Sequence, residues 1–462
     1  MTARDIRMAL TSPRRPAPAP ERARPERARV DAGSSVVLNG LAFFAPLLVF
    51  AEINLVGRLF ITELLLLAAL PVLLLTRGAM LARGSAVTVI VLLLLWFAGQ
   101  VATDIARQTP FLDYSRGWAK IGFTTLNFMA LYLVLTGSRQ RIRLFVLGLA
   151  LGGLLVFFTS TVEAAFSDPW KFIIGLPVTW LVVLVAQTAW ARRFWPMPVV
   201  LMGMVGTYSM LMGSRALAGV TLMAAVFVML QNIASLRRSS GGRALSPLRI
   251  ALFLAFGLVA SWGLLTAYET SAARGWLGTD AQEKLFWQKS SEYGLLLGGR
   301  SEILVSLEAI GDSPLLGHGS WAKNVYYAAQ LQDIQSPGSA AAFLVSDTDL
   351  IPTHSHLFGA WVEAGILGVP IWLFALWLVV RALSNVMTLR EPIVPLVALF
   401  GFMLLWDIIF SPFGADRRIV FPFVMVVLLM AGDRLRRPQV QGAEAYAPAR
   451  RSRIAAARLH HG

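Results

Sequence analysis

Apolar runs of about 16–25 residues follow one another along most of this chain, separated by short polar breaks. A helix needs ~20 apolar residues to cross the hydrocarbon core of a bilayer, where every backbone polar group must be paired. Runs of this length exceed the ~10-residue alternating segments of a membrane β-barrel. With 56% hydrophobic and 15% charged residues, the chain also lacks the polar surface that a soluble protein of this length needs. The sequence therefore predicts an all-α polytopic membrane protein.

We place about twelve transmembrane helices, nine of them within residues 36–268 and three within 356–431. The predicted spans are 36–51, 59–76, 85–102, 121–136, 144–165, 173–190, 197–213, 217–233, 249–267, 357–380, 393–410 and 418–431. The first two are close enough in sequence to form a helical hairpin that is closed by the polar segment 52–58.

One long polar loop, residues 269–355, separates the ninth and tenth spans. Within it, residues 301–310 place Ile303, Leu304, Leu307 and Ile310 on one side of a helix, which predicts an amphipathic helix beside the membrane. Residues 332–342 are rich in small and polar side chains and are predicted to be a mobile loop.

The distribution of charge predicts which ends of the spans face the cytoplasm. With both termini inside, the inner segments hold 28 of the 41 Lys and Arg residues, and the outer segments hold 13. This bias follows the positive-inside rule, and it places the long loop outside, in the periplasm. The basic ends, residues 1–35 and 432–462, are predicted to be cytoplasmic tails, the first of them disordered, and no cleavable signal peptide is expected.

Composition also limits the chemistry. The chain has no cysteine, which excludes disulfides, thiol nucleophiles and thiolate metal sites. Its net charge of +15 is concentrated in the tails, where it favours topology and anionic lipid over nucleic acid. Neither a P-loop nor a dinucleotide-binding glycine motif is present. A site in the outer loop would have no access to cytoplasmic ATP or sugar nucleotides. Its chemistry must therefore use substrates delivered on a membrane carrier, or energy already stored in a bond.

Two arginines stand at positions suited to an anionic group. Arg215 lies in a very short break between two apolar spans, flanked by small residues, and Arg300 follows two glycines at the start of the predicted loop helix. A guanidinium matches the oxygens of phosphate in a planar fork. The alternatives are a snorkelling arginine at a helix end for Arg215 and a loop ion pair with Glu302 or Glu308 for Arg300.

Two of the chain's five histidines, His354 and His356, precede the tenth span. Histidine is the side chain best suited to act as a general base near neutral pH. Glu363, about two turns further on, could orient His356 or face the bundle. Asp347 and Asp349 suggest a rival interpretation, in which a D-x-D and H-x-H pair binds a divalent metal. Glu63, Glu163 and Asp407, each flanked by apolar residues, could serve an outer cavity or cap helices.

In order and spacing, four segments together resemble the O-antigen ligase and O-antigen polymerase superfamily of bacterial membrane glycosyltransferases. They are Ser214-Arg215, Gly299-Arg300, Ser313-Pro-Leu-Leu-Gly317-His318-Gly319, and His354-Ser355 with the following Trp361-Val-Glu363-Ala-Gly365-Ile-Leu-Gly368. The resemblance implies a protein of the bacterial inner membrane that transfers a glycan from undecaprenyl diphosphate to an acceptor hydroxyl in the periplasm, without a metal or other cofactor.

The resemblance also implies roles for particular residues. His354 would be the general base on the acceptor hydroxyl, and Arg215 and Arg300 would hold the diphosphate and stabilise its charge as it leaves. Members of the family often carry Asn after this histidine, whereas this chain has Ser355 and then His356, so either histidine could be the base; we favour His354. Further substrate contacts are expected from His356, His318, Glu363, Arg116, Lys120 and Arg418.

Several functions remain open at this point. The acceptor is lipid A–core in a ligase and another carrier-linked glycan in a polymerase, and the sequence does not separate the two. A transporter of lipid-linked glycans would be expected to show an internal repeat, and we find no convincing one. A metal-dependent hydrolase would use the Asp347, Asp349, His354 and His356 cluster.

Overall fold

The structure is a computed structural model. It describes residues 25–54, 57–82, 84–160, 166–239, 301–335, 349–387, 389 and 391–433, together with scattered positions between 263 and 286. The predicted span 249–267 lies almost entirely outside these ranges. The predicted tail 432–462 lies outside them apart from its first two residues.

The described chain is built almost wholly from helices, with one short two-stranded hairpin. The elements are α2 (Pro25–Leu47), η1 (Leu48–Phe50), β1 (Glu52–Asn54), β2 (Arg58–Phe60), α3 (Ile61–Arg77), η2 (Gly78–Met80), α4 (Ser85–Arg107), α5 (Phe111–Leu135), α6 (Arg139–Thr159), η3 (Trp170–Ile174), α8 (Gly175–Ala186), α9 (Ala189–Arg193), α10 (Met197–Leu211), α11 (Arg215–Ser239), α15 (Glu302–Asp312), α16 (Val325–Gln335), α17 (His356–Ala364), η5 (Gly365–Gly368), α18 (Pro370–Val386), α19 (Val394–Phe410) and α20 (Arg417–Asp433).

Apolar helices long enough to cross a membrane confirm the predicted all-α membrane class. Within the described residues, five helices meet this test, and a sixth does if α17 and α18 are taken as one bent span; four further apolar helices are shorter. Every predicted span other than 249–267 coincides with helical structure. The prediction of twelve spans is not confirmed by these numbers.

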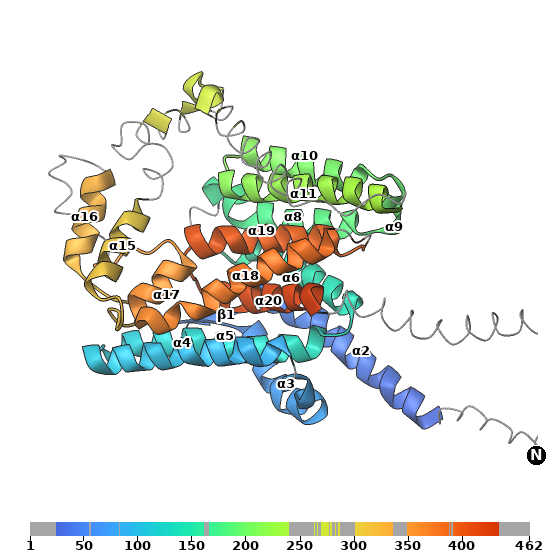
Figure 1. Cartoon of the computed structure of the whole chain (residues 1–462), viewed down its shortest axis with the longest axis horizontal. Helices are drawn as coiled ribbons and strands as arrows, with labels where there is room; N and C mark the ends of the chain where they lie inside the picture. The colour runs from blue at the N-terminus through green and yellow to red at the C-terminus, as the bar shows by residue number, and fades with distance from the viewer. Residues whose placement is uncertain are drawn as a thin grey trace, which may run out of the picture.

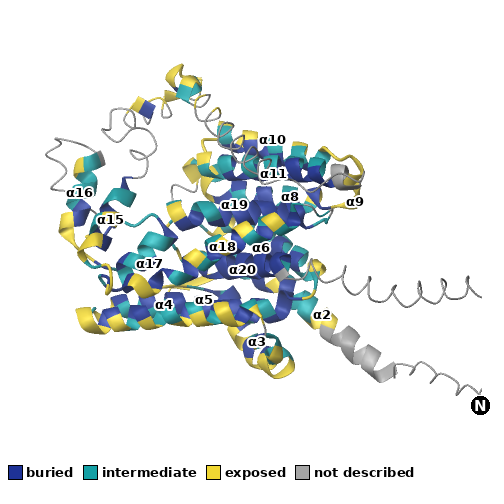
Figure 2. Ribbon diagram, viewed as in Figure 1, coloured by how far each residue is buried: buried dark blue, intermediate teal, exposed yellow. Residues whose placement is uncertain are grey.

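The helices pack side by side in a bundle, and α15 and α16 project from one end of it (Figure 1). The N-terminal end of α2 lies at the opposite end (Figure 1). Buried residues concentrate in α19 and α20 at the centre (Figure 2). There Phe423 stacks on Phe145 and meets Phe400 edge to face. By contrast, α3 and α4 carry exposed apolar side chains such as Val72, Leu75 and Val91, as expected of helices that face lipid.

The segment between the first two predicted spans forms a β-hairpin. Glu52 pairs with Phe60 and Asn54 with Arg58 in antiparallel register. The side chain of Glu63 accepts a hydrogen bond from the backbone N–H of Phe60 at 3.0 Å, which caps the start of α3. This bears out the capping alternative for Glu63.

The predicted span 357–380 coincides with a bent pair of helices and not with one straight helix. Helix α17 ends at Ala364, η5 follows, and α18 leaves at an angle of 110°. The cause lies at Gly365, whose φ of +63° favours glycine, and where a Cβ would lie 2.1 Å from the carbonyl oxygen of Leu315. Pro370 then opens α18, where its missing N–H costs no helical hydrogen bond.

Two further boundaries differ from the predictions. Residues 332–335, expected to be mobile, complete α16, because Tyr327, Leu331 and Ile334 repeat at helical spacing and pack against α15. Residues 336–342 lie outside the described chain. At the N-terminus, α2 begins at Pro25, so the last part of the segment predicted as a disordered tail is helical; residues 1–24 are not described.

Candidate functional site

The loop between α15 and α16 is tied to the broken helix α17–η5. The backbone N–H of His318 donates to the carbonyl of Val362 at 2.7 Å, and that of Gly319 donates to the carbonyl of Glu363 at 3.1 Å. Gly317 and Gly319 both have positive φ, and a Cβ on Gly317 would lie 2.6 Å from the backbone N of Gly365. We call the glycine-rich segment 313–319 the docking loop. Only glycine lets its backbone come this close to the backbone of α17 and η5.

Asp104 of α4 fixes the other side of this loop. Its Oδ1 accepts from the backbone N–H of Ser320 at 2.7 Å, and its Oδ2 accepts from the Ser320 hydroxyl at 2.6 Å and from Trp118 Nε1 at 2.9 Å. Asp104 is buried, so these bonds satisfy a carboxylate that would otherwise be costly. We did not predict a role for Asp104; a carboxylate in the last turn of an apolar helix is the signal that could have found it.

The ring of His318 is used within the same unit. Its Nε2 lies 2.7 Å from the carbonyl oxygen of Ala309 on α15, and the ring meets Tyr327 of α16 edge to face. A carbonyl oxygen can only accept, so Nε2 carries the proton. These contacts give His318 a structural role and account for it without a substrate.

His354 and His356 have opposite environments. His354 lies in the extended segment before α17, and 45% of its side chain is exposed. His356 is buried, its Nδ1 lies 2.7 Å from the carbonyl oxygen of Ser411, and its ring contacts Trp372 and Phe413. Of the two histidines, His354 is the one that substrate can reach from outside the bundle.

Within the part of the chain that the structure describes, α15 supplies a charged partner for His354. Its Nδ1 lies 3.6 Å from Glu302 Oε1, and the Glu302 side chain is only 15% exposed. Two residues earlier, the carbonyl of Pro352 accepts a hydrogen bond from the Ser306 hydroxyl at 2.8 Å. The start of the loop helix and the histidine segment, predicted separately from the sequence, thus lie together.

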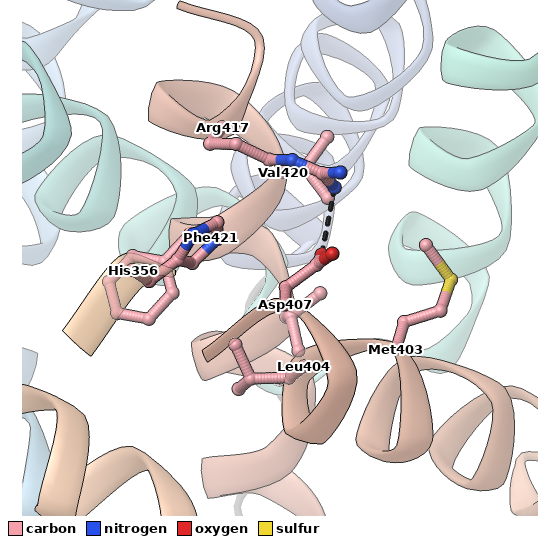
Figure 3. A pocket seen from close by; sticks show the side chains of 8 residues that line it. His356, Met403, Leu404, Asp407, Arg417, Val420 and Phe421 are labelled. Carbon is pink, nitrogen blue, oxygen red and sulfur yellow. Dashed lines mark ion pairs between the residues drawn. The ribbon is translucent and has the colours of Figure 1, made fainter. Parts of the chain in front are cut away.

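A small pocket lies behind His356, between α17, α19 and α20 (Figure 3). Arg417 Nη1 and Asp407 Oδ2 form an ion pair at 2.9 Å across it, and Asp416 lies 3.5 Å from Arg417 Nε. Its other walls are apolar: Met403, Leu404, Val420, Phe421 and Val424. We did not single out Arg417. Its two carboxylate partners leave this group of charges net negative, which does not suit a diphosphate.

The two predicted contacts on α5 lie one turn apart. Lys120 forms an ion pair with Glu363 of α17, and its ammonium lies 5.3 Å from the centre of the Trp321 ring. Arg116 is partly buried on the same side of α5. Glu363 is therefore paired with Lys120 and does not orient His356.

Arg418 is held inside the protein. Its Nε and Nη2 lie 2.8 and 2.7 Å from the two carboxylate oxygens of Glu63, and Nη2 also donates to the carbonyl of Arg58. Glu63 is fully buried and Arg418 is 8% exposed. This bidentate pair joins α20 to α3 and accounts for Arg418 without a substrate.

Of the two arginines predicted to bind the diphosphate, the structure describes Arg215 but not Arg300. Arg215 is exposed and is the first residue of α11, directly after the turn that follows α10. Arg300 lies outside the described residues, as does Asp347; Arg300 is bonded to Ser301, which precedes α15. Within the described ranges, no three His, Asp or Glu side chains group in a way that could hold a metal ion.

Alternation of the helices places Arg215 at the same end of the bundle as His354. The α4–α5 turn touches the docking loop, since a Cβ on Gly319 would lie 2.6 Å from Thr109 Oγ1. From there α5, α6, α8 and α10 run back and forth in turn, so α10 ends, and α11 begins, at this end.

Comparison of the chain with protein-family models, with curated proteins and with solved structures gives no match.

Proposed function

We propose that this protein is a metal-independent membrane glycosyltransferase that moves a glycan from undecaprenyl diphosphate to an acceptor hydroxyl, with lipid A–core as the acceptor. The proposal rests on the family resemblance of the four sequence segments. The structural observation that supports it is the meeting of His354 with the first turn of α15, which begins two residues after Arg300 in the chain.

In the proposed reaction, His354 removes the proton from the acceptor hydroxyl. The acceptor oxygen forms a bond to the anomeric carbon while the bond from that carbon to the diphosphate oxygen breaks. The bonding electrons leave with undecaprenyl diphosphate, whose growing charge Arg215 and Arg300 stabilise. The exposure of His354 supports its choice as base over His356, whose ring is enclosed by aromatic side chains.

The proposal includes the membrane arrangement. Twelve spans in a bacterial inner membrane, with both termini in the cytoplasm, would place α15 to α17 at the periplasmic face, where the carrier diphosphate lies. Since α3 and α4 expose apolar side chains, lipid would surround this side of the bundle. Lys120 lies at the docking loop, where its ammonium is paired with Glu363, and Arg116 lies one turn before it on α5.

A transfer assay with the purified protein tests the function. The protein would receive an undecaprenyl-diphosphate glycan in EDTA, with or without lipid A–core. We expect single-step transfer to lipid A–core. Growth of the carrier-linked glycan without lipid A–core would identify a polymerase instead. Transfer that appears only after a metal is added would support the metal-dependent alternative.

Variants test the residues. We expect His354→Ala to reduce transfer by the ~10²–10⁴-fold that a general base contributes, and Arg215→Ala and Arg300→Ala to abolish it while membrane insertion is retained. The matched control is Arg274→Ala, since Arg274 is exposed in the same predicted loop and its side chain lies over the Trp276 ring. A fully active His354→Ala would sink the assignment of the base.

A further inference from the structure

Two residues of α15 meet two residues of the extended segment that carries His354. Glu302 and Ser306 are four residues apart and share one face of the helix. Pro352 and His354 are two residues apart in the segment that precedes α17. The Ser306 hydroxyl bonds the Pro352 carbonyl at 2.8 Å, and Glu302 Oε1 lies 3.6 Å from His354 Nδ1. Helix and segment are thus held in a fixed register.

Burial makes the second of these contacts chemically significant. His354 Nδ1 and Glu302 Oε2 are both buried and have no hydrogen-bond partner among the described residues. A buried polar atom without a partner destabilises the fold, because it has lost its hydrogen bonds to water and gained none in return. The carboxylate beside Nδ1 is the group that can satisfy it. Because 45% of the His354 side chain is exposed while Nδ1 is buried, the exposed edge of the ring is the one that carries Nε2.

We propose that Glu302 is the positioning residue for His354. Its carboxylate accepts the Nδ1 proton and so keeps Nε2 unprotonated and turned toward the acceptor hydroxyl. When Nε2 takes the acceptor proton, the ring becomes a cation, and the carboxylate stabilises it. The 3.6 Å separation closes to a hydrogen bond at that stage, since such contacts are long in the absence of substrate. This role rests on the proposed function.

Other charged groups near this segment are separate from the pair. His356, Asp407 and Arg417 gather on the far side, around Ser411 and the pocket behind His356. Asp349 is exposed, and its carbonyl accepts from the backbone N–H of Asn324 at 2.7 Å. The remaining neighbour in sequence, Arg300, is assigned to the diphosphate.

The pH dependence of transfer tests the proposal. A carboxylate at Nδ1 favours the protonated ring, so its removal lets the ring lose its proton at lower pH. In Glu302→Gln we therefore expect the acidic limb of the pH–rate profile to move to lower pH. The rate at the optimum should fall by about 10-fold or more, within the contribution of a general base. Glu302→Asp should recover part of the rate and of the wild-type profile.

Ser306→Ala is the matched control. It removes the hydroxyl that contacts the Pro352 carbonyl at 2.8 Å and the backbone carbonyl of Glu302 at 2.6 Å, and it leaves the Glu302 carboxylate in place. We expect its acidic limb to stay at the wild-type pH. Thermal unfolding of each variant separates a folding defect from a chemical one. A Glu302→Gln protein with wild-type unfolding and an unmoved acidic limb would overturn the positioning role.

The outcome is separable from that of the proposed function. The wild type and His354→Ala would be assayed beside these variants. If His354→Ala transfers glycan normally, the assignment of the base fails, whatever Glu302→Gln does. If His354 is required but Glu302→Gln and Glu302→Asp keep the wild-type rate and profile, only the role of Glu302 is wrong.

Discussion

At the scale of single residues, two histidines separated by one serine have opposite environments. Ser355 produces the difference: its hydroxyl caps α17 by accepting from the backbone N–H of Phe358 and donates to the carbonyl of Ile408. His356 therefore starts the helix and enters the aromatic cluster, whereas His354 stays outside in the extended segment. The base assignment favoured from the sequence thus remains a prediction, now with a structural reason behind it.

The buried pair of Arg418 and Glu63 gives a prediction on stability. Replacement of one partner, as in Arg418→Met, leaves the buried Glu63 carboxylate uncompensated. We expect a loss of about 3–5 kcal/mol, while the double variant Arg418→Met with Glu63→Leu should recover most of it, because no charge then stays buried. Thermal unfolding in detergent measures both. Equal losses in the single and double variants would contradict this account.

At the scale of elements, the break between α17 and α18 is the feature that shapes the site. It leaves the carbonyls of Val362 and Glu363 free of helical hydrogen bonds, and they accept hydrogen bonds from backbone N–H groups of the docking loop. A straight helix would use those carbonyls internally. The bend therefore turns part of a predicted membrane span into the docking site for the loop that joins α15 to α16.

The docking of this loop on α17 and η5 depends on Gly365. In Gly365→Ala, the new Cβ would meet the carbonyl of Leu315 at 2.1 Å at a positive φ, so the docking loop must move. We expect a lower unfolding temperature and faster proteolysis of the α15–α16 region. Gly311→Ala is the control, because Gly311 lies in α15 with open space around it and the helix gains from alanine. Equal unfolding temperatures and equal proteolysis rates in the two variants would argue against this role of Gly365.

The pairing of α15 with α16 carries a pH dependence. Burial and a hydrogen bond to Asp312 raise the pKa of Tyr327, and a hydrogen bond to Glu308 raises that of Tyr326. A raised phenol pKa stabilises the fold fully below the unfolded value of about 10, and the contribution is lost as the pH rises above it. We expect the unfolding temperature to fall as the pH rises above about 10, and to fall less in Tyr327→Phe. If the unfolding temperature of Tyr327→Phe falls with pH as steeply as that of the wild type, Tyr327 is not the source of the pH dependence.

At the scale of the whole molecule, the described helices form a bundle with α15 and α16 at one end (Figure 1). The docking loop joins this end to α4 through Asp104 and to α17 through backbone hydrogen bonds. The site is thus supported from the membrane helices and not only by the loop that carries it. This support holds α15 and the His354 segment together.

The absence of cysteine makes the predicted orientation directly testable. Single cysteines would be placed at Val325 on α16 and at Trp190 on α9, both of which are exposed. We expect a membrane-impermeant maleimide to label Val325→Cys in intact cells without an outer membrane. Trp190→Cys should be labelled only after the inner membrane is opened. The reverse pattern would invert the topology and remove the periplasmic site.

The sequence by itself determined the helical membrane class and the positions of the apolar helices, because span length and hydrophobicity are local properties. It also predicted the amphipathic helix α15 from the spacing of its apolar residues. The tertiary structure decided the break at Gly365, the burial of His356, and the pairings of Arg418 with Glu63, Lys120 with Glu363, and His354 with Glu302. Each joins residues distant in the chain or depends on packing around them, and no local periodicity encodes such contacts.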